Sequence, residues 1–128
     1  RYAPTSMNTQ SVVYKIITDR AVLEWLAKTR GPASAPLGKA PLAVAICSDP
    51  SKTKRPEQDA DIAAYHFMLA ARFLGLGTCW IAALDRDDLK EMLGIPEGHY
   101  VATVTPLGWP LKVTEELPDR RPVEDLFL

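Results

Sequence analysis

The order of the predicted elements indicates an α+β or α/β domain, in which helices cover a mixed β-sheet. Three stretches support this class. Residues 11–18 are β-branched and aromatic, residues 57–74 repeat apolar side chains at helical spacing, and residues 99–105 are again β-branched. With 128 residues, 47% of them hydrophobic, the chain can bury one core, so we expect a single domain over residues 1–128.

The first part of the chain predicts two strands and one helix. Residues 11–18 (SVVYKIIT) are apolar on both faces, which indicates a central strand buried on most sides. Asp19 can cap the helix that follows, and this helix should stop before residue 31. Residues 31–41, rich in Gly, Pro and Ala, predict a loop, and residues 42–48 predict a second buried strand.

The long stretch 57–74 predicts the core helix. Its alanines suit close packing, and its larger side chains recur every three to four residues, which places them toward the core. The predicted inward set is Ile62, Tyr65, His66, Leu69, Ala70 and Phe73. Gly75 or Gly77 should end the helix in a left-handed turn, and residues 78–82 should then run extended.

The last third of the chain predicts a short helix, a strand and an arm. Asp85 should cap the helix and Gly94 should end it. Its predicted inward residues are Leu89, Met92 and Leu93. Residues 99–105 (HYVATVT) have a strand pattern. Beyond residue 110 the chain is charged and interrupted by prolines, which predicts an extended arm with at most a short final turn.

Composition and charge exclude several classes of partner. With 15 basic and 16 acidic side chains, the formal net charge of −1 provides no positive field for nucleic acid. The longest apolar runs, such as residues 41–47, are far shorter than the roughly 18 residues of a membrane span. Cys47 and Cys79 lie in apolar runs and are expected to be buried thiols. Because His66 and His99 are isolated from them, no metal site is expected.

No acid–base or nucleophile motif is present. Three carboxylate pairs lie in polar stretches, so we expect them on a solvated surface: Asp59 with Asp61, Asp87 with Asp88, and Glu115 with Glu116. No serine lies in a GxSxG turn, so acyl-transfer chemistry has no support. Gly75 and Gly77 follow a helix instead of opening one, which is the reverse of a dinucleotide-binding turn.

Five short motifs occur in a fixed order along almost the whole chain. They are APTSMNTQ (3–10), DIAAYHFMLAARFLGLGTCWIAA (61–83), LGIPEG (93–98), VTPLGWP (104–110) and RRPVED (120–125). Each motif alone is compatible with a turn or a cap, but their order resembles the nitroreductase family of flavoproteins. The resemblance implies the nitroreductase fold: a mostly antiparallel sheet flanked by helices, with a C-terminal arm exchanged in a homodimer.

The same resemblance implies that flavin mononucleotide (FMN) binds at the interface of the homodimer. The segment 3–10 would contact the isoalloxazine ring and the ribityl chain. Its candidate binding residues are Pro4, Thr5, Ser6 and Asn8. Pro4 would fix the turn, while the other three bring hydroxyl and amide groups that can pair with the flavin. For Ser6 and Asn8 the alternative is an ordinary capped turn.

A second implied set passes alongside the flavin ring. It consists of Cys79, Trp80, Ile81, Ala82 and Ala83. A backbone N–H of Ala82 or Ala83 would lie near the hydride-accepting nitrogen and stabilise the negative charge that develops there. Many relatives have a glutamate and a glycine at these two positions. A contact made by the main chain is still possible with alanine at both positions. A backbone conformation that only glycine can adopt would be lost.

The C-terminal motif supplies two arginines. The guanidinium of Arg120 or Arg121 suits the flavin phosphate, with Arg120 the better match, and the alternative is a solvated pair. The family's upstream arginine-rich element and first helix are not present in these 128 residues. We therefore expect either a missing leader, which a start at Arg1 without an initiating methionine favours, or a shortened member with a weakened site.

The function implied by the resemblance is an FMN-dependent oxidoreductase. It would transfer a hydride from NADH or NADPH through bound flavin to an electron-poor acceptor such as a nitroaromatic or a quinone, with no catalytic side chain. A flavin-binding module for storage or sensing and a flavin-free structural dimer remain alternatives. Apolar residues near both ends favour a homodimer: Met7, Trp109, Leu126, Phe127 and Leu128. In the absence of an export signal we expect a cytoplasmic location.

Overall fold

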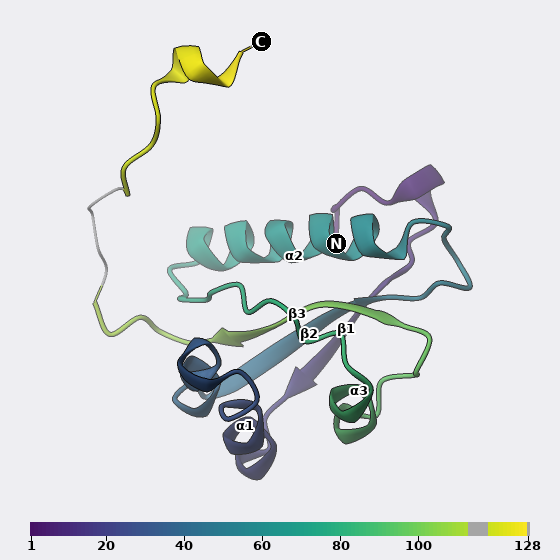
Figure 1. Ribbon diagram of the computed structural model, residues 1–128, viewed down its shortest axis with the longest axis vertical. Coiled ribbons are helices and arrows are strands. Elements are labelled where there is room, and N and C mark those ends of the chain that lie inside the picture. The colour runs from purple at the N-terminus through teal and green to yellow at the C-terminus, as the bar shows by residue number, and fades with distance from the viewer. Residues whose placement is uncertain (113–117, 128) are drawn as a thin grey trace.

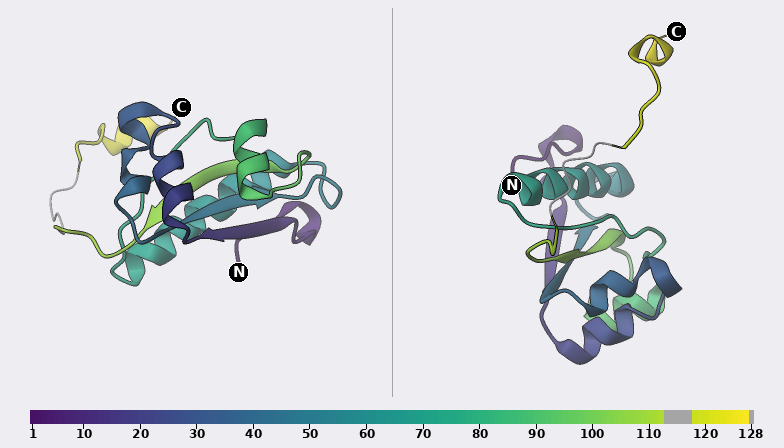
Figure 2. Two further views of the ribbon diagram at one scale, coloured as in Figure 1. Left: turned by 90° about the horizontal axis from the view of Figure 1, so that it is seen from below. Right: turned by 90° about the vertical axis from the view of Figure 1, so that its left-hand side faces the viewer.

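The computed structural model describes residues 1–112 and 118–127, and it is built on one three-stranded antiparallel sheet (Figure 1). The strands are β1 (Val12–Ile17), β2 (Leu42–Ser48) and β3 (Tyr100–Leu107), with β2 in the middle. Helices lie on both faces of the sheet (Figure 2), which confirms the predicted α+β class. Among the described residues every strand pair is antiparallel, so the parallel part of the expected mixed sheet is not found there.

Strand β1 lies at the edge of the sheet, and the prediction of a central strand was wrong. Among residues 1–112 and 118–127 it pairs with β2 alone, from Val12 opposite Ser48 to Ile17 opposite Ala43. The side chains of residues 13–16 are exposed, including Ile16 at 65%. An apolar pattern on both faces shows that a strand can be buried, but it does not show which element covers it.

Two short helices cover one face of the sheet. Helix α1 (Arg20–Leu26) begins where the Asp19 carboxylate accepts hydrogen bonds from the N–H groups of Ala21 and Val22, at 2.8 and 3.2 Å, which confirms the predicted cap. Helix α3 (Asp87–Leu93) ends at Gly94 in the left-handed conformation, as expected. Its cap position is Arg86 and not Asp85. The core of this face contains Leu23, Leu26, Leu37, Ala43, Ala45, Cys47, Ile81, Leu84, Leu89, Leu93, Val101 and Val104.

The long helix α2 (Pro56–Phe73) covers the other face through small residues. Its buried alanines, Ala60, Ala63, Ala64 and Ala71, allow the helix to approach Val44, Ile46 and Ala102 of the sheet closely. The larger side chains point the other way, since Tyr65, Leu69 and Phe73 are 59%, 51% and 90% exposed. The inward set expected from periodicity was therefore wrong, because the apolar period of this helix has a second, outward stripe.

The remaining segments are short or irregular. Residues 31–41 form two 3-10 turns, η2 (Gly31–Ala33) and η3 (Ala35–Gly38). Met92 of α3 is 46% exposed, which corrects its expected inward position.

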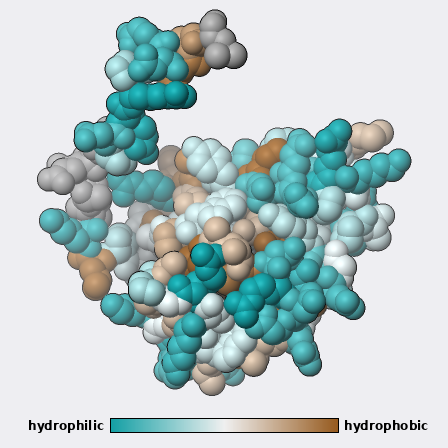
Figure 3. All heavy atoms as spheres, viewed as in Figure 1, coloured by the Kyte–Doolittle hydropathy of each residue, from teal (hydrophilic) through white to brown (hydrophobic). Residues whose placement is uncertain are grey.

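The C-terminal part contains the turn η4 (Val123–Leu126), and Figure 3 shows apolar atoms at this end of the molecule. Glu115, Glu116 and Leu128 lie outside the described residues. Among the described residues, no helix has the length and apolar character needed to cross a bilayer.

Candidate functional site

The N-terminal segment 3–10 forms a tight turn before β1. It contains the 3-10 turn η1 (Ser6–Asn8), and the Thr5 hydroxyl accepts a hydrogen bond from the Gln10 N–H at 2.9 Å. Three of its residues have a positive φ, with Met7 at 51°, Asn8 at 56° and Gln10 at 50°. These angles lie in the left-handed region, which non-glycine residues rarely adopt, so the surrounding structure must hold this backbone in place.

Three of the four residues expected from this segment line one cavity. Pro4, Thr5 and Asn8 border a space of about 510 Å³ that extends to Tyr14 on β1. Ser6 is not part of its lining. Within residues 1–112 and 118–127, the Ser6 hydroxyl and the Asn8 side-chain amide have no hydrogen-bond partner. Both groups are therefore available to a ligand.

A buried carboxylate that the sequence assigned to the surface holds this segment. Asp59, on the first turns of α2, is 0% exposed. Its Oδ1 accepts a hydrogen bond from the Ser6 N–H at 2.7 Å, and its Oδ2 accepts one from the Ser11 hydroxyl at 2.9 Å. Ser48 Oγ in turn donates to Ser11 Oγ at 2.9 Å. The solvated-surface interpretation of Asp59 was wrong because its partners are 53 and 48 residues away in sequence.

The hydrogen bonds decide the charge of this carboxylate. Burial favours its neutral form, but the Ser6 N–H and the Ser11 hydroxyl, which both donate to it, stabilise the ionised form more strongly. The pKa of Asp59 is therefore lower than that of an ordinary aspartate. Asp61, two residues further along α2, behaves in the opposite way, because burial and the nearby Glu57 raise its pKa.

The second expected segment, 79–83, is held against β3 by threonines. Thr105 Oγ1 donates to the Cys79 carbonyl at 2.8 Å. Thr103 Oγ1 contacts both polar groups of Ile81, accepting from its N–H at 3.2 Å and donating to its carbonyl at 3.1 Å. The Ile81 side chain is buried in the core of the α1 and α3 face. The segment thus runs extended beside β3, as predicted for residues 78–82.

Beyond Ile81 the backbone turns outward and exposes two N–H groups. Ala82 and Ala83 are exposed, and Ala83 has a φ of 57°. The Arg30 guanidinium donates to the Ala82 carbonyl. In the part of the chain that the structure describes, the N–H groups of Ala82 and Ala83 donate to no acceptor. The conformation at residue 83 favours glycine but is adopted by alanine, so the residue present does not prevent it.

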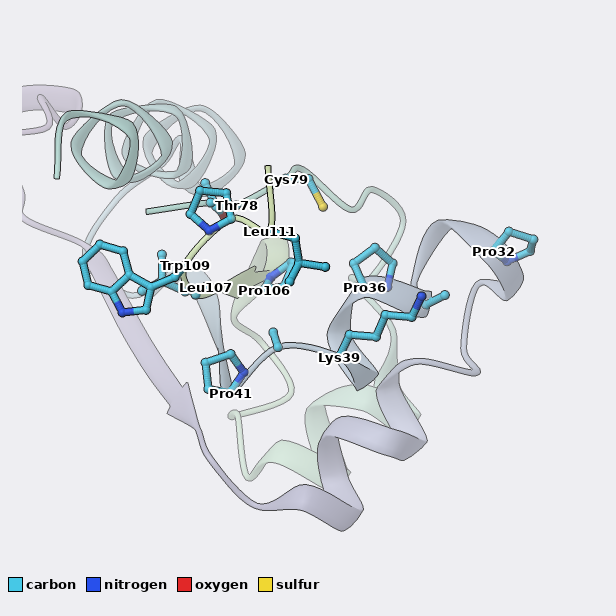
Figure 4. A pocket seen from close by; sticks show the side chains of 15 residues that line it. Pro32, Pro36, Lys39, Pro41, Thr78, Cys79, Pro106, Leu107, Trp109 and Leu111 are labelled. Atoms are coloured by element: carbon cyan, nitrogen blue, oxygen red, sulfur yellow. The ribbon is translucent and has the colours of Figure 1, made fainter. Parts of the chain in front are cut away.

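Cys79 also lines a separate cavity of about 560 Å³ (Figure 4). The cavity lies between the 3-10 turns of residues 31–41 and the end of β3, and its walls include Pro36, Lys39 and Trp109. Cys79 is half-buried and Cys47 is buried, and neither forms a disulfide. Burial raises the pKa of both thiols, that of Cys47 to about 12 with a further contribution from Asp85. Both cysteines are thus neutral thiols at pH 7.

The described residues of this chain do not bring all the expected site residues together. The N-terminal residues and Cys79 line different cavities. Trp80 is 39% exposed. Arg120 and Arg121 are exposed in the C-terminal part, where the Arg120 guanidinium donates to the neighbouring Asp119 carbonyl at 2.9 Å. In the described ranges, no group of three or more His, Cys, Asp or Glu side chains is placed to hold a metal ion.

Sequence reasoning missed two residues next to the expected segments. Asp59 contacts the first segment and Arg30 contacts the second. Neither residue had a local signal, since both act on backbone groups about 50 residues away. Only the three-dimensional arrangement reveals them.

The antiparallel sheet with helices on both faces, together with the two exposed motif segments, defines the class of the chain as a nitroreductase-like α+β domain. The sequence matches the Nitroreductase family over residues 1–109. The match covers most of the 128 residues, and the chain therefore belongs to this family.

Individual relatives agree with this assignment. The chain is 35% identical over 118 residues to a candidate NADH dehydrogenase/NAD(P)H nitroreductase of Archaeoglobus fulgidus, and the match covers 84% of this chain and 66% of that protein. A crystal structure of a candidate NADH dehydrogenase/NAD(P)H nitroreductase from Parabacteroides distasonis gives a TM-score of 0.87 at 26% identity, covering 99% of this chain and 77% of that one. An FMN-dependent nitroreductase from Clostridium difficile gives 0.83 at 27% identity, covering 99% and 79%.

Proposed function

We propose that this chain is an FMN-dependent oxidoreductase that transfers a hydride from NADH or NADPH, through bound flavin, to an electron-poor acceptor such as a nitroaromatic or a quinone. Family membership and the FMN-dependent relative from Clostridium difficile support the cofactor. When bound, FMN supplies the hydride chemistry, and the protein supplies binding, orientation and electrostatics. The absence of an acid–base dyad from the expected site is compatible with that division of roles.

The observation that carries this proposal is the pair of free N–H groups at Ala82 and Ala83. They lie in an exposed turn whose carbonyl side is occupied by Arg30. Backbone N–H groups fixed in one direction stabilise negative charge without having to reorganise. In the proposed site the N–H of Ala82 or Ala83 would donate to the flavin nitrogen that receives the hydride. Small side chains at both positions leave room for a planar ring to approach.

The distribution of backbone strain supports the same two segments. Among the described residues, four non-glycine residues have a positive φ: Met7, Asn8, Gln10 and Ala83. All four lie within residues 3–10 or 79–83, the two segments that the family motifs assign to the flavin. Strained backbone persists where function requires it and where neighbouring structure stabilises it. The unpaired Ser6 hydroxyl and Asn8 amide add polar groups of the kind that bind a ribityl chain or a ring edge.

The proposed active form is a homodimer. Because the N-terminal segment and Cys79 line different cavities of one protomer, we infer that a complete flavin site combines segments from two protomers. The outward stripe of α2, formed by Tyr65, Leu69 and Phe73, offers apolar surface for such an association. Arg120 or Arg121 would reach the flavin phosphate from the C-terminal arm.

An absorption experiment tests the proposal. The purified protein is incubated with FMN and desalted, and its visible spectrum is recorded before and after addition of NADH, and separately NADPH, under nitrogen. We expect a protein-bound flavin spectrum that bleaches with one of the two donors. Bound flavin that stays oxidised would identify a binding module instead. A protein that retains no FMN would contradict the proposal, as would a monomer in light scattering at micromolar concentration.

A further inference from the structure

Asp59 is a buried charge without a cationic partner among the described residues. It is 0% exposed, and none of the ion pairs formed within residues 1–112 and 118–127 includes it. An isolated buried carboxylate is costly unless hydrogen bonds satisfy it. The Ser6 N–H and the Ser11 hydroxyl provide these bonds from outside the helix. The position of Asp59 on the first turns of α2 adds the favourable field of the helix N-terminus.

These bonds connect a rigid element to a strained one. On one side, Asp59 lies on α2, whose alanines pack closely against the sheet. On the other side, Ser6 begins the turn in which Met7 and Asn8 have positive φ. Ser6 N donates to Asp59 Oδ1 at 2.7 Å, a length typical of a strong hydrogen bond to a charged acceptor. A free segment of this sequence would rarely adopt these angles, so an external restraint is needed.

We propose that Asp59 is the positioning residue of the flavin-binding segment, and that its carboxylate pre-forms the turn 5–10 before the cofactor arrives. Asp59 does not touch the flavin. It fixes the backbone on both sides of residues 7–9, through Ser6 N and through Ser11, so that the Asn8 amide and the Ser6 hydroxyl are presented in one arrangement. Affinity for a ligand falls in proportion to the fraction of molecules in the competent arrangement, so loss of this restraint weakens binding.

This inference rests on the proposed FMN function, and its test separates the two. The variants are Asp59→Ala, Asp59→Asn and Ser11→Ala, with Asp61→Asn as a matched control on the same helix. FMN dissociation constants are measured by quenching of flavin fluorescence. Hydrogen exchange of the amides of residues 6–10 is measured in the flavin-free proteins, with the Ile81 amide, which donates to Thr103 of β3, as an internal reference. Circular dichroism confirms that each variant is folded at the assay temperature.

We expect Asp59→Ala to weaken FMN binding about 30-fold, the size of a lost hydrogen bond to a charged group. Asparagine keeps the shape and an acceptor for the Ser6 N–H, so Asp59→Asn should restore most of the affinity, to within about fivefold of the parent. Exchange at Ser6 should accelerate at least about tenfold in Asp59→Ala and remain unchanged at Ile81. Ser11→Ala should lie between the parent and Asp59→Ala, and Asp61→Asn should match the parent.

Two results would overturn the inference. One is unchanged exchange at residues 6–10 in Asp59→Ala, and the other is FMN affinity within twofold of the parent in a variant whose exchange is faster. If Asp59→Ala does not fold, the same comparisons are made with Asp59→Asn and Ser11→Ala. A parent protein that fails to bind FMN would refute the proposed function instead, while the exchange data would still decide whether Asp59 holds the turn.

Discussion

The two segments of the candidate flavin site are held in different ways. The turn 5–10 depends on one charged side chain, Asp59. This residue lies on helix α2, 53 residues after Ser6 in the sequence. The segment 79–83 depends on two neutral side chains, Thr103 and Thr105, which contact it from the neighbouring strand β3. Both segments contain strained, exposed backbone. The first is held by a buried carboxylate, whereas the charged group that contacts the second, the Arg30 guanidinium, is exposed.

Both segments contain a backbone conformation that non-glycine residues rarely adopt, and different side chains hold it in place in each. A carboxylate has several acceptor positions and can satisfy donors from separate parts of a turn, so its loss affects the whole turn. Threonine hydroxyls act one residue at a time along an extended backbone, so the loss of one leaves the other in place. Stability provided by the carboxylate should depend on pH, whereas stability provided by the hydroxyl groups should not, and a single substitution should cost less in the second segment than in the first.

The largest effect on stability is expected from Asp59→Ala. It leaves the Ser6 N–H and the Ser11 hydroxyl without their acceptor in a buried place, so the free energy of unfolding should fall by about 3 kcal/mol. Urea denaturation followed by tryptophan fluorescence measures it. A loss below about 1 kcal/mol would show that the buried charge costs as much as its hydrogen bonds contribute.

A smaller loss is expected from Thr103→Val. Valine keeps the shape of threonine but cannot bond to the N–H or carbonyl of Ile81, so unfolding should become easier by about 2 kcal/mol. Thr103→Ser, which retains the hydroxyl, is the control and should lose less than half as much. If Thr103→Val were as stable as the parent, the hydroxyl bonds to Ile81 would contribute nothing to stability, and the contrast with Asp59 would be lost.

The pH dependence of stability should distinguish the two segments directly. The pKa of Asp59 is lowered in the folded state, so its stabilising contribution is present above the ordinary aspartate pKa of about 3.9 and is lost as the pH falls through the lower folded value. The unfolding free energy should therefore fall more between pH 7 and this acid range in the parent than in Asp59→Asn. Thr103→Val should keep the parental slope, and a flattened slope in that variant would break the comparison.

The smallest effect is expected at residue 83. Ala83→Gly relieves the left-handed backbone but adds freedom to the unfolded chain, so the two contributions nearly cancel and stability should change by less than about 0.5 kcal/mol. Ala83→Val, which places a β-branched side chain at this φ, is the matched comparison and should be clearly destabilising. Thermal unfolding measures both. Equal stability of the valine variant would mean that the turn relaxes to another conformation.

Local signals predicted the parts of the fold that depend on neighbouring residues. The Asp19 cap, the strand at 42–48 and the left-handed Gly94 were all confirmed because cap and turn chemistry acts within a few residues. The orientation of α2 could not be read in this way, since its sequence has both an alanine stripe and a large apolar stripe. Which stripe meets the sheet depends on how close the helix must approach it.

The candidate site was predictable as two motif segments but not as a set of contacts. The motifs selected residues 3–10 and 79–83 as flavin contacts, which stays a prediction, and the positive φ angles within both segments came only from the structure. The burial of Asp59 depends on a turn far away in the sequence, so a polar stretch on α2 gave no indication of it. A charged residue in a polar stretch is normally solvated, and only the fold reveals the exception.

The separation of the two cavities has a consequence for how the protein would respond to dilution. In the proposed dimer, cofactor binding and subunit association are thermodynamically linked, because each complete site needs groups from both protomers. Excess FMN would then drive dimer formation, and dilution would release flavin even at a fixed ratio of flavin to protein. Specific activity would rise with protein concentration until the subunits are fully associated, so expression level would act as a control on turnover per chain.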